Sequence, residues 1–195
     1  MKVIGLTGAP GCGKSTVLKI FVELGWKALD ADAVCAELHT NPRSGIHEKL
    51  AEIWGKEVVA PDGTTNKKVL AEIVFADETE RKRLEAVLHP FIDRRTRELF
   101  QSFGEEANVM FDVPLLFECG WDKRTDKTIA VWAPPEIQME RLLARSWTRE
   151  HALFRIQSQI PAEKKLELAD YGLINNSTIE HLKQQCIRLN QCLNS

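Results

Sequence analysis

The sequence lacks several features that would point to particular classes of protein. It has no run of about 18 apolar residues, which excludes a membrane-spanning helix of ordinary length. Its first apolar stretch is too short for a signal peptide, so we expect a cytoplasmic protein with no membrane partner. The net charge is only −2 over 195 residues, so nothing in the composition indicates a nucleic-acid partner. Internal repeats and low-complexity stretches are absent too.

The cysteines show neither disulfide nor zinc-ligand spacing. They are odd in number and form no Cys-x-x-Cys pair: Cys12, Cys35, Cys119, Cys186 and Cys192. We therefore expect free thiols in a reducing compartment and no zinc site. The length predicts a single domain over residues 1–195, with room for small inserted subdomains.

The strongest positive signal is a glycine-rich segment near the N-terminus. Residues 8–16, GAPGCGKST, fit the phosphate-loop pattern G-x-x-x-x-G-K-[ST]. Apolar residues 3–7 predict a strand before the loop, and helical spacing of apolar residues predicts a helix after it. A glycine-rich turn that binds nothing is the alternative, but every fixed position and both flanks fit the motif. Lys14 is expected to reach the β- and γ-phosphates of ATP, and Ser15 to ligate Mg²⁺. The nucleotide-binding residues predicted from this loop are Gly11, Cys12, Gly13, Lys14, Ser15 and Thr16.

Predicted strands and helices alternate along the rest of the chain. Further strands are expected at residues 26–29, 108–112, 128–132 and 171–174. Helices are expected at 33–54 with an interruption at 41–42, at 67–75, at 77–103 with a break or kink at His89-Pro90, and at 135–145, 149–159, 162–169 and 178–194. Alternation predicts an α/β fold with a five-stranded parallel sheet flanked by helices, the three-layer sandwich of P-loop proteins. Ligands of such sheets bind beyond the carboxyl ends of the strands.

Carboxylates follow two of the predicted strands. Asp30 and Asp32 come after the second strand, and Asp112 ends the third. A carboxylate at this edge can accept a proton from an attacking hydroxyl, or hold Mg²⁺ directly or through water. The alternatives are helix capping for the Asp30/Asp32 pair and a turn before Val113-Pro114 for Asp112. We expect a functional role for at least one member of the pair, and Asp112 is a candidate for the metal shell or the substrate.

An arginine cluster follows the fourth strand: Arg141, Arg145, Arg149 and Arg155. Arginines on a lid that closes over substrate supply the cations that phosphoryl transfer needs. A solvated helix surface is the alternative. For His89, a buried or capping histidine at a helix break is favoured over a contact with the acceptor. Cys12 is interpreted as a small side chain that fills space in the loop, although a helix start tends to lower a thiol pKa.

Together these motifs resemble the dephospho-coenzyme A kinases over nearly the whole chain. The most specific runs are Asp30-Ala31-Asp32 and residues 112–118, DVPLLFE, in this order. Weaker matches lie at Leu24-Gly25, Asp62-Gly63, Leu88-His89-Pro90, Gln138, Arg155-Ile156, Gln159 and Asn175-Asn176. The resemblance implies ATP-dependent phosphorylation of the ribose 3′-hydroxyl of dephospho-coenzyme A, which is the last step of coenzyme A synthesis.

The resemblance also implies roles for individual residues. Asp32 matches the catalytic base, with Lys14 and Arg145 as the other catalytic residues. Arg141, Arg145 and Asn175 join the nucleotide-binding set. The implied substrate-binding residues are Asp32, Lys67, His89 and Asp112. Mg²⁺ is expected on Ser15, with Asp32 or Asp112 directly or through water. Lys67 stands where the family often has arginine, and it lacks the planar fork of a guanidinium.

The resemblance implies a division of the chain as well. It predicts a core at about 1–32, 104–140 and 170–195, a helical acceptor-binding insertion at about 33–103, and a lid at about 141–165. The expected partner is the small molecule dephospho-coenzyme A, and the expected state is a monomer or small homo-oligomer.

Three rival functions remain open on the sequence. One is another P-loop kinase acting on a nucleoside, nucleotide or sugar acid. Another is a nucleotide switch, but Asn66-Lys67-Lys68-Val69 lacks the final aspartate of the guanine-reading motif Asn-Lys-x-Asp. The third is a catalytically silent binding module, which the intact Lys14, Ser15 and Asp32 disfavour.

Overall fold

The computed structural model describes residues 1–194, with side chains for all of them except residues 75 and 76. Five strands form one sheet in the order β2-β3-β1-β4-β5. They are β1 (Lys2–Thr7), β2 (Lys27–Asp30), β3 (Asn108–Asp112), β4 (Lys127–Trp132) and β5 (Tyr171–Ile174). β1 runs parallel to both β3 and β4, with Leu6 opposite Asp112 and Thr7 opposite Ala130. The five predicted strands and their parallel sheet are confirmed.

The predicted helices are present with shifts of a few residues at their ends. They are α1 (Lys14–Glu23), α2 (Ala31–Thr40), α3 (Ile46–Trp54), α4 (Lys67–Ala76), α5 (Glu78–Phe103), α6 (Pro135–Leu143), α7 (Arg149–Gln157), α8 (Ala162–Leu168) and α9 (Ile179–Asn194). Short 3₁₀ turns lie at Lys56–Val58 and Trp121–Arg124. Among the described residues, none of the helices combines the length and the apolar character that crossing a membrane requires.

The described chain separates into two compact units. The sheet unit contains Met1–Leu29 and the chain from Phe103 onward. The helical unit contains Asp30–Ser102, and therefore α2, α3, α4 and nearly all of α5.

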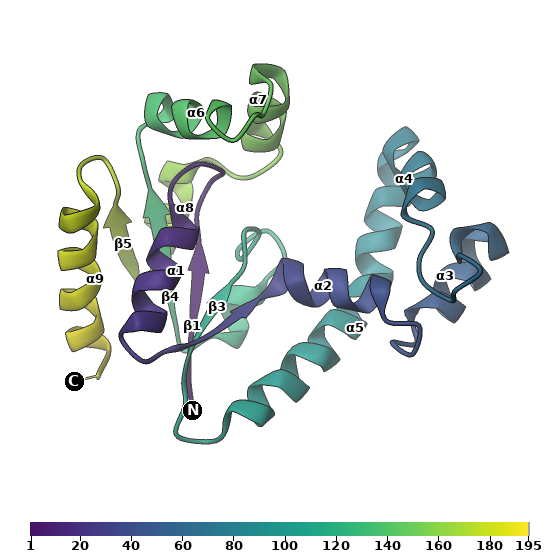
Figure 1. Cartoon of the computed structure of the whole chain (residues 1–195), viewed down its shortest axis with the longest axis horizontal. Helices are drawn as coiled ribbons and strands as arrows, with labels where there is room; N and C mark the ends of the chain where they lie inside the picture. The colour runs from purple at the N-terminus through teal and green to yellow at the C-terminus, as the bar shows by residue number, and fades with distance from the viewer. Residues whose placement is uncertain (195) are drawn as a thin grey trace. The chain divides into compact units, whose positions relative to one another are not determined.

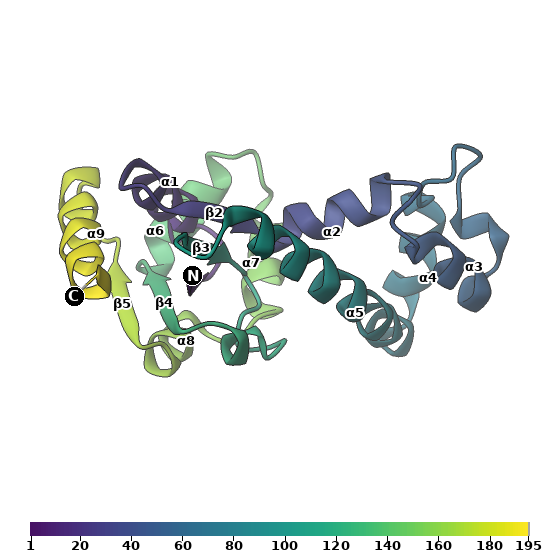
Figure 2. The ribbon, with the colours of Figure 1, turned by 90° about the horizontal axis from the view of Figure 1, so that it is seen from below.

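The sheet unit has three layers. α1 and α9 lie on one face of the sheet, and α8 lies on the other (Figure 2). Residues 3–7 of β1 are all buried, as expected for a central strand covered on both faces. The predicted stripe of α9 is buried in the same core, through Leu182, Cys186, Leu189 and Leu193. These layers place the carboxyl ends of the strands and the loop before α1 at one edge of the sheet.

The helical unit has its own core between its helices. Its buried residues are Leu38, Ile46, Leu50, Val58, Leu70, Val74 and Leu88. The predicted interruption at His89-Pro90 is wrong in one respect, because α5 runs unbroken from Glu78 to Phe103 with Pro90 inside it. Proline removes one backbone hydrogen bond and crowds the preceding turn, and α5 bends along its length instead of ending (Figure 1).

Candidate active site

The phosphate loop joins β1 to α1 and is packed against two distant segments. Gly11 and Gly13 have φ values of 80° and 97°. A Cβ atom at Gly11 would lie 2.6 Å from the carbonyl oxygen of Gln138, and one at Gly13 would lie 2.1 Å from Nδ2 of Asn175. Both positions therefore need glycine for two reasons, the left-handed backbone and the lack of space.

Arg141 and Asn175 hold the loop from outside. The Arg141 guanidinium donates to the carbonyl oxygens of Gly11 and Cys12, at 3.3 and 3.4 Å, and to Oδ1 of Asn175 at 3.2 Å. Nδ2 of Asn175 donates to the Cys12 carbonyl at 2.8 Å. The structure thus brings Arg141, Asn175 and the loop together, and Arg141 departs from the alternative of a solvated surface arginine.

Lys14 and Asp112 form a close ion pair at the edge of the sheet. Nζ of Lys14 lies 2.5 Å from Oδ1 of Asp112, and their side chains are 18% and 7% exposed. The pairing is a consequence of the strand order, because Asp112 ends β3 next to β1 and α1 begins at Lys14. A carboxylate and an ammonium are therefore already in place where the phosphates of a nucleotide are expected to bind.

The Cys12 side chain is part of the sheet unit's core. It is fully buried, and burial raises the pKa of its thiol despite the opposing effect of Lys14. A buried thiol with a raised pKa is unreactive, because the thiolate is the nucleophile. The interpretation of Cys12 as a small side chain that fills space agrees with this environment. All five cysteines are free thiols, as expected.

Asp30 and Asp32 have different environments, which the sequence left open. Oδ1 of Asp30 accepts hydrogen bonds from the backbone N–H groups of Asp32 and Ala33, at 2.8 and 3.2 Å, and so caps α2. Asp32 lies in the first turn of α2 with an exposed side chain. Asp32 is therefore the better candidate of the two for proton transfer.

One face of α2 contains chemistry that the sequence reasoning missed. Asp32, Cys35 and His39 lie at spacings of three and four residues and so share a face. Burial lowers the pKa of His39 to about 4, and the nearby Lys67 and His47 contribute to the decrease. Burial raises the pKa of the Cys35 thiol, the Asp32 carboxylate raises it further, and Lys67 opposes both effects. Lys67 is therefore close to the face of Asp32, and the helical spacing of 32, 35 and 39 was the signal available in the sequence.

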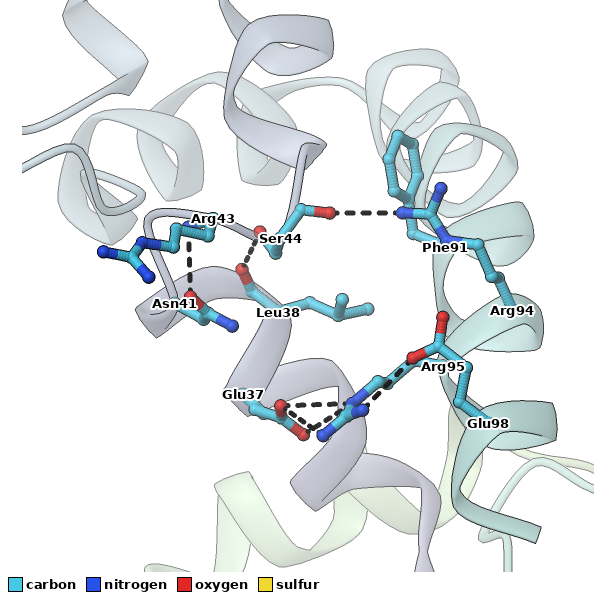
Figure 3. Close-up of a pocket in the computed structure, with 9 residues that line it drawn as sticks. All are labelled: Glu37, Leu38, Asn41, Arg43, Ser44, Phe91, Arg94, Arg95 and Glu98. Carbon is cyan, nitrogen blue, oxygen red and sulfur yellow. Dashed lines mark hydrogen bonds and ion pairs between the residues drawn. The ribbon is translucent and has the colours of Figure 1, made fainter. Parts of the chain in front are cut away.

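A second feature of the helical unit is a cavity of about 220 Å³ between α2 and α5 (Figure 3). Glu37 and Arg95 face each other there, with Nη2 of Arg95 2.9 Å from Oε1 of Glu37. Glu37 is five positions after Asp32 within α2, which is about 140° away around the helix. The cavity therefore opens on the opposite side of α2 from the candidate base.

The remaining predicted site residues lie outside these hydrogen-bonded groups, and most of them are exposed. Arg145, Arg149 and Arg155 are exposed, and their guanidinium groups form no ion pair or hydrogen bond within residues 1–194. Lys67 is the exposed first residue of α4, and His89 is partly buried within α5. The roles assigned to these residues stay predictions.

The oxygen atoms at the loop suit a metal ion that arrives with a nucleotide. Ser15 presents an exposed hydroxyl in the first turn of α1, and Asp112 presents a carboxylate. No cluster of three or more metal-ligating side chains occurs in the part of the chain that is described. Mg²⁺ ordinarily takes one or two protein ligands together with phosphate oxygens and water, so this sparse set fits it.

Comparisons with known proteins agree with the motifs. A family model described as dephospho-CoA kinase matches residues 2–181. A dephospho-CoA kinase of Listeria monocytogenes serotype 4b is 37% identical over 190 residues, covering 95% of this chain and 94% of the relative. A dephospho-CoA kinase of Aquifex aeolicus is also 37% identical, over 187 residues, with 95% and 94% covered.

Solved structures agree with the fold. A dephospho-CoA kinase of Campylobacter jejuni has a TM-score of 0.73 at 29% identity, covering 98% of this chain and 96% of the other. A shikimate kinase of Acinetobacter baumannii in complex with shikimate has a TM-score of 0.55 at 20% identity, with 99% and 93% covered. This second likeness concerns the fold alone. The predicted P-loop kinase fold is therefore confirmed.

Proposed function

The chain belongs to the dephospho-CoA kinase family, and from this premise we propose that it transfers the γ-phosphoryl group of ATP to the ribose 3′-hydroxyl of dephospho-coenzyme A. The products are coenzyme A and ADP. The observation that supports this most is the match of the family over residues 2–181, which includes both the phosphate loop and the acceptor-side run at Asp30-Ala31-Asp32.

On the nucleotide side, the phosphate loop and Lys14 bind the ATP phosphates. The support is geometric. Arg141 and Asn175 fix the loop through hydrogen bonds, and the Lys14 ammonium, at the end of the loop, is already paired with Asp112. Lys14 neutralises charge that develops on the transferred group, which is where electrostatic catalysis acts. Ser15 would hold Mg²⁺, with Asp112 or Asp32 as a further ligand directly or through water, and the ion would neutralise phosphate charge. Arg145, on the lid, joins Lys14 when substrates are bound.

On the acceptor side, Asp32 is the general base. It takes the proton of the 3′-hydroxyl as the hydroxyl oxygen attacks the γ-phosphorus, and the bond from that phosphorus to the β,γ-bridging oxygen breaks. The support is that Asp30 caps α2, and that the exposed Asp32 side chain lies on the helix face shared with His39 and close to Lys67. Lys67 and His89 contact the acceptor, and the helical unit provides the acceptor-binding surface.

We further propose that the enzyme works in the cytoplasm on small molecules alone, as a monomer or small homo-oligomer. No specific observation favours a rival function. The shikimate kinases share the fold at 19–20% identity, which does not extend to their substrate.

A coupled assay of ADP release tests the proposal. We expect turnover with ATP and dephospho-coenzyme A, and little turnover with adenosine, AMP or shikimate as the acceptor. Mass spectrometry of the product should show one added phosphoryl group on the ribose. The Lys14→Ala variant controls for contaminating kinases. Efficient phosphorylation of a nucleoside or sugar acid, with no reaction of dephospho-coenzyme A, would overturn the assignment.

A further inference from the structure

Lys165, in the short helix α8, is a fully buried lysine in the sheet unit. Its Nζ donates to the carbonyl oxygen of Pro114 at 2.5 Å and to Oε1 of Gln159 at 2.9 Å. It also pairs with Oε1 of Glu118 at 3.1 Å. Lys165 is 0% exposed. Three acceptors match the three N–H donors of an ammonium group, so the buried charge is fully satisfied.

The Pro114 carbonyl is a junction between three segments of the sheet unit. It accepts hydrogen bonds from the hydroxyl of Thr7, at 2.9 Å, and from Lys165. Thr7 ends β1 and leads into the phosphate loop, and Pro114 is two residues after Asp112. The backbone N–H of Val113 also donates to Leu6, at 2.9 Å. The position of Asp112 therefore depends on how this short segment is held.

The other two contacts of Lys165 reach the connection between α7 and α8. Gln159 lies in that connection, and Oε1 of Glu118 accepts a hydrogen bond from the backbone N–H of Ile160 at 3.1 Å. Burial lowers the pKa of Lys165 against the opposing effect of Glu118, and Lys14 of the phosphate loop is near enough to lower it as well. One ammonium group thus ties the segment after Asp112 to the end of the predicted lid.

We propose that Lys165 is a positioning residue, which keeps the Asp112 carboxylate in register with Lys14 and anchors the base of the lid to the sheet. The proposal rests on the proposed kinase function, since it assigns a role in that reaction. Lys165 acts through Pro114, Glu118 and Gln159. It does not contact the reacting atoms.

Stability alone is a poor reason for this arrangement. Burying an ion pair costs desolvation free energy, and apolar residues of similar volume often replace such pairs with no loss of stability. Removing only one partner is different, because it leaves a charge without compensation. A test must therefore neutralise both charges at once, and Lys165→Met with Glu118→Gln does so. The glutamine keeps an oxygen that can accept the hydrogen bond of Ile160.

The experiment compares this double variant with wild type and with Lys164→Met. Lys164 is the matched control, because it is the preceding residue of α8 but is exposed and, within the described residues, forms its ion pair with Glu167. We expect kcat of the Lys165→Met/Glu118→Gln variant to fall about 10- to 100-fold, as is usual when a residue that orients an active-site group is lost. The KM for dephospho-coenzyme A should change little. Hydrogen exchange should accelerate in residues 113–120 with no substrate present.

A cycle with Asp112→Asn separates positioning from a purely structural role. If Lys165 acts through Asp112, the Lys165→Met/Glu118→Gln change should cost far less kcat in the Asp112→Asn background than in wild type. Equal losses in both backgrounds, or an unchanged kcat with exchange as in wild type, would overturn the proposal. A wild-type enzyme inactive on dephospho-coenzyme A would instead contradict the proposed function, and the exchange measurement would still report on the anchor.

Discussion

The two units of the molecule present their candidate residues in different ways. In the sheet unit, Lys14 is paired with Asp112. Arg141 and Asn175 donate hydrogen bonds to the backbone of the phosphate loop. In the helical unit, Asp32 and Lys67 have exposed side chains on helix starts. The comparison indicates that the nucleotide side is preorganised by contacts within the chain. In the proposed acceptor-binding unit, by contrast, the candidate side chains are exposed, and we predict that the substrate itself engages them.

The largest expected loss of activity comes from replacing the proposed base in the helical unit. Asp32→Asn keeps the shape of the side chain and removes its ability to take a proton. We expect kcat to fall about 10²- to 10⁴-fold, the usual contribution of a general base, while the Kd for ATP stays near that of wild type. Steady-state kinetics and calorimetric titration with an ATP analogue measure the two quantities.

Asp30→Asn is the matched control for Asp32→Asn. Asparagine is also a good N-cap, so α2 should stay intact and kcat should change much less. If Asp30→Asn were the more damaging variant, the base would be assigned to the wrong aspartate.

The next largest expected loss of activity comes from replacing the lysine of the phosphate loop. Lys14→Ala should lower kcat about 10²- to 10³-fold, because it removes a preorganised cation from the transferred phosphoryl group. It should also leave Asp112 without its ion-pair partner while the fold, measured by circular dichroism, persists. A folded variant that retains most of its activity would contradict the role of the phosphate loop.

Within the sheet unit, Arg145 and Arg141 are expected to affect kcat and KM differently. Arg145 is exposed and is predicted to reach phosphate only when the lid closes, so Arg145→Ala should lower kcat about 10²-fold with little change in KM for ATP. Arg141 already holds the loop, so Arg141→Ala should raise the KM for ATP as well. Arg149→Ala serves as the control. Wild-type kcat in both Arg145→Ala and Arg141→Ala would contradict a catalytic role for the two arginines.

The smallest expected effect concerns the stability of the helical unit. The pKa of His39 is lowered from 6.5 to about 4 by burial, so the folded state disfavours its protonation. The unfolded chain binds that proton at higher pH, and the stabilisation is lost as pH falls from about 6.5 toward 4. Between pH 7.5 and pH 5.0 this linkage amounts to about 2 kcal/mol, or roughly 4–8 °C in Tm.

Thermal melts of His39→Gln and of the exposed-site control His181→Gln, at pH 7.5 and pH 5.0, measure how much His39 contributes to the pH dependence of stability. The His39→Gln variant should lose less Tm than wild type between the two pH values, whereas His181→Gln should behave like wild type. Equal pH dependence in all three proteins would remove His39 as the source.

Local patterns were enough to predict most of the fold. The phosphate loop, the buried strands and the α9 stripe each depend on neighbours in sequence, and all are found. The break at Pro90 was overestimated, because flanking residues such as Leu88 pack in the helical core and hold both halves of α5 together. Tertiary burial of that kind outweighs a local preference.

The candidate site was only partly predictable. The motif indicated Lys14 and Asp112, but not that they form a pair across 98 residues. Asp30 and Asp32 are equally good caps on local sequence alone. The family resemblance assigned the base to Asp32, and the observed hydrogen bonds assign the cap to Asp30. Lys165 gave no signal, since its partners Pro114 and Glu118 are more than 40 residues away and a lysine in a helix is ordinarily exposed.

The division of labour between the two units is tested most directly by hydrogen exchange with each substrate alone. The account predicts that a non-hydrolysable ATP analogue protects mainly residues 8–16 and the predicted lid at 141–165. Dephospho-coenzyme A should protect amides within residues 33–100 and the lid. Protection by dephospho-coenzyme A that is confined to residues 8–16 would contradict the claim that the helical unit binds the acceptor.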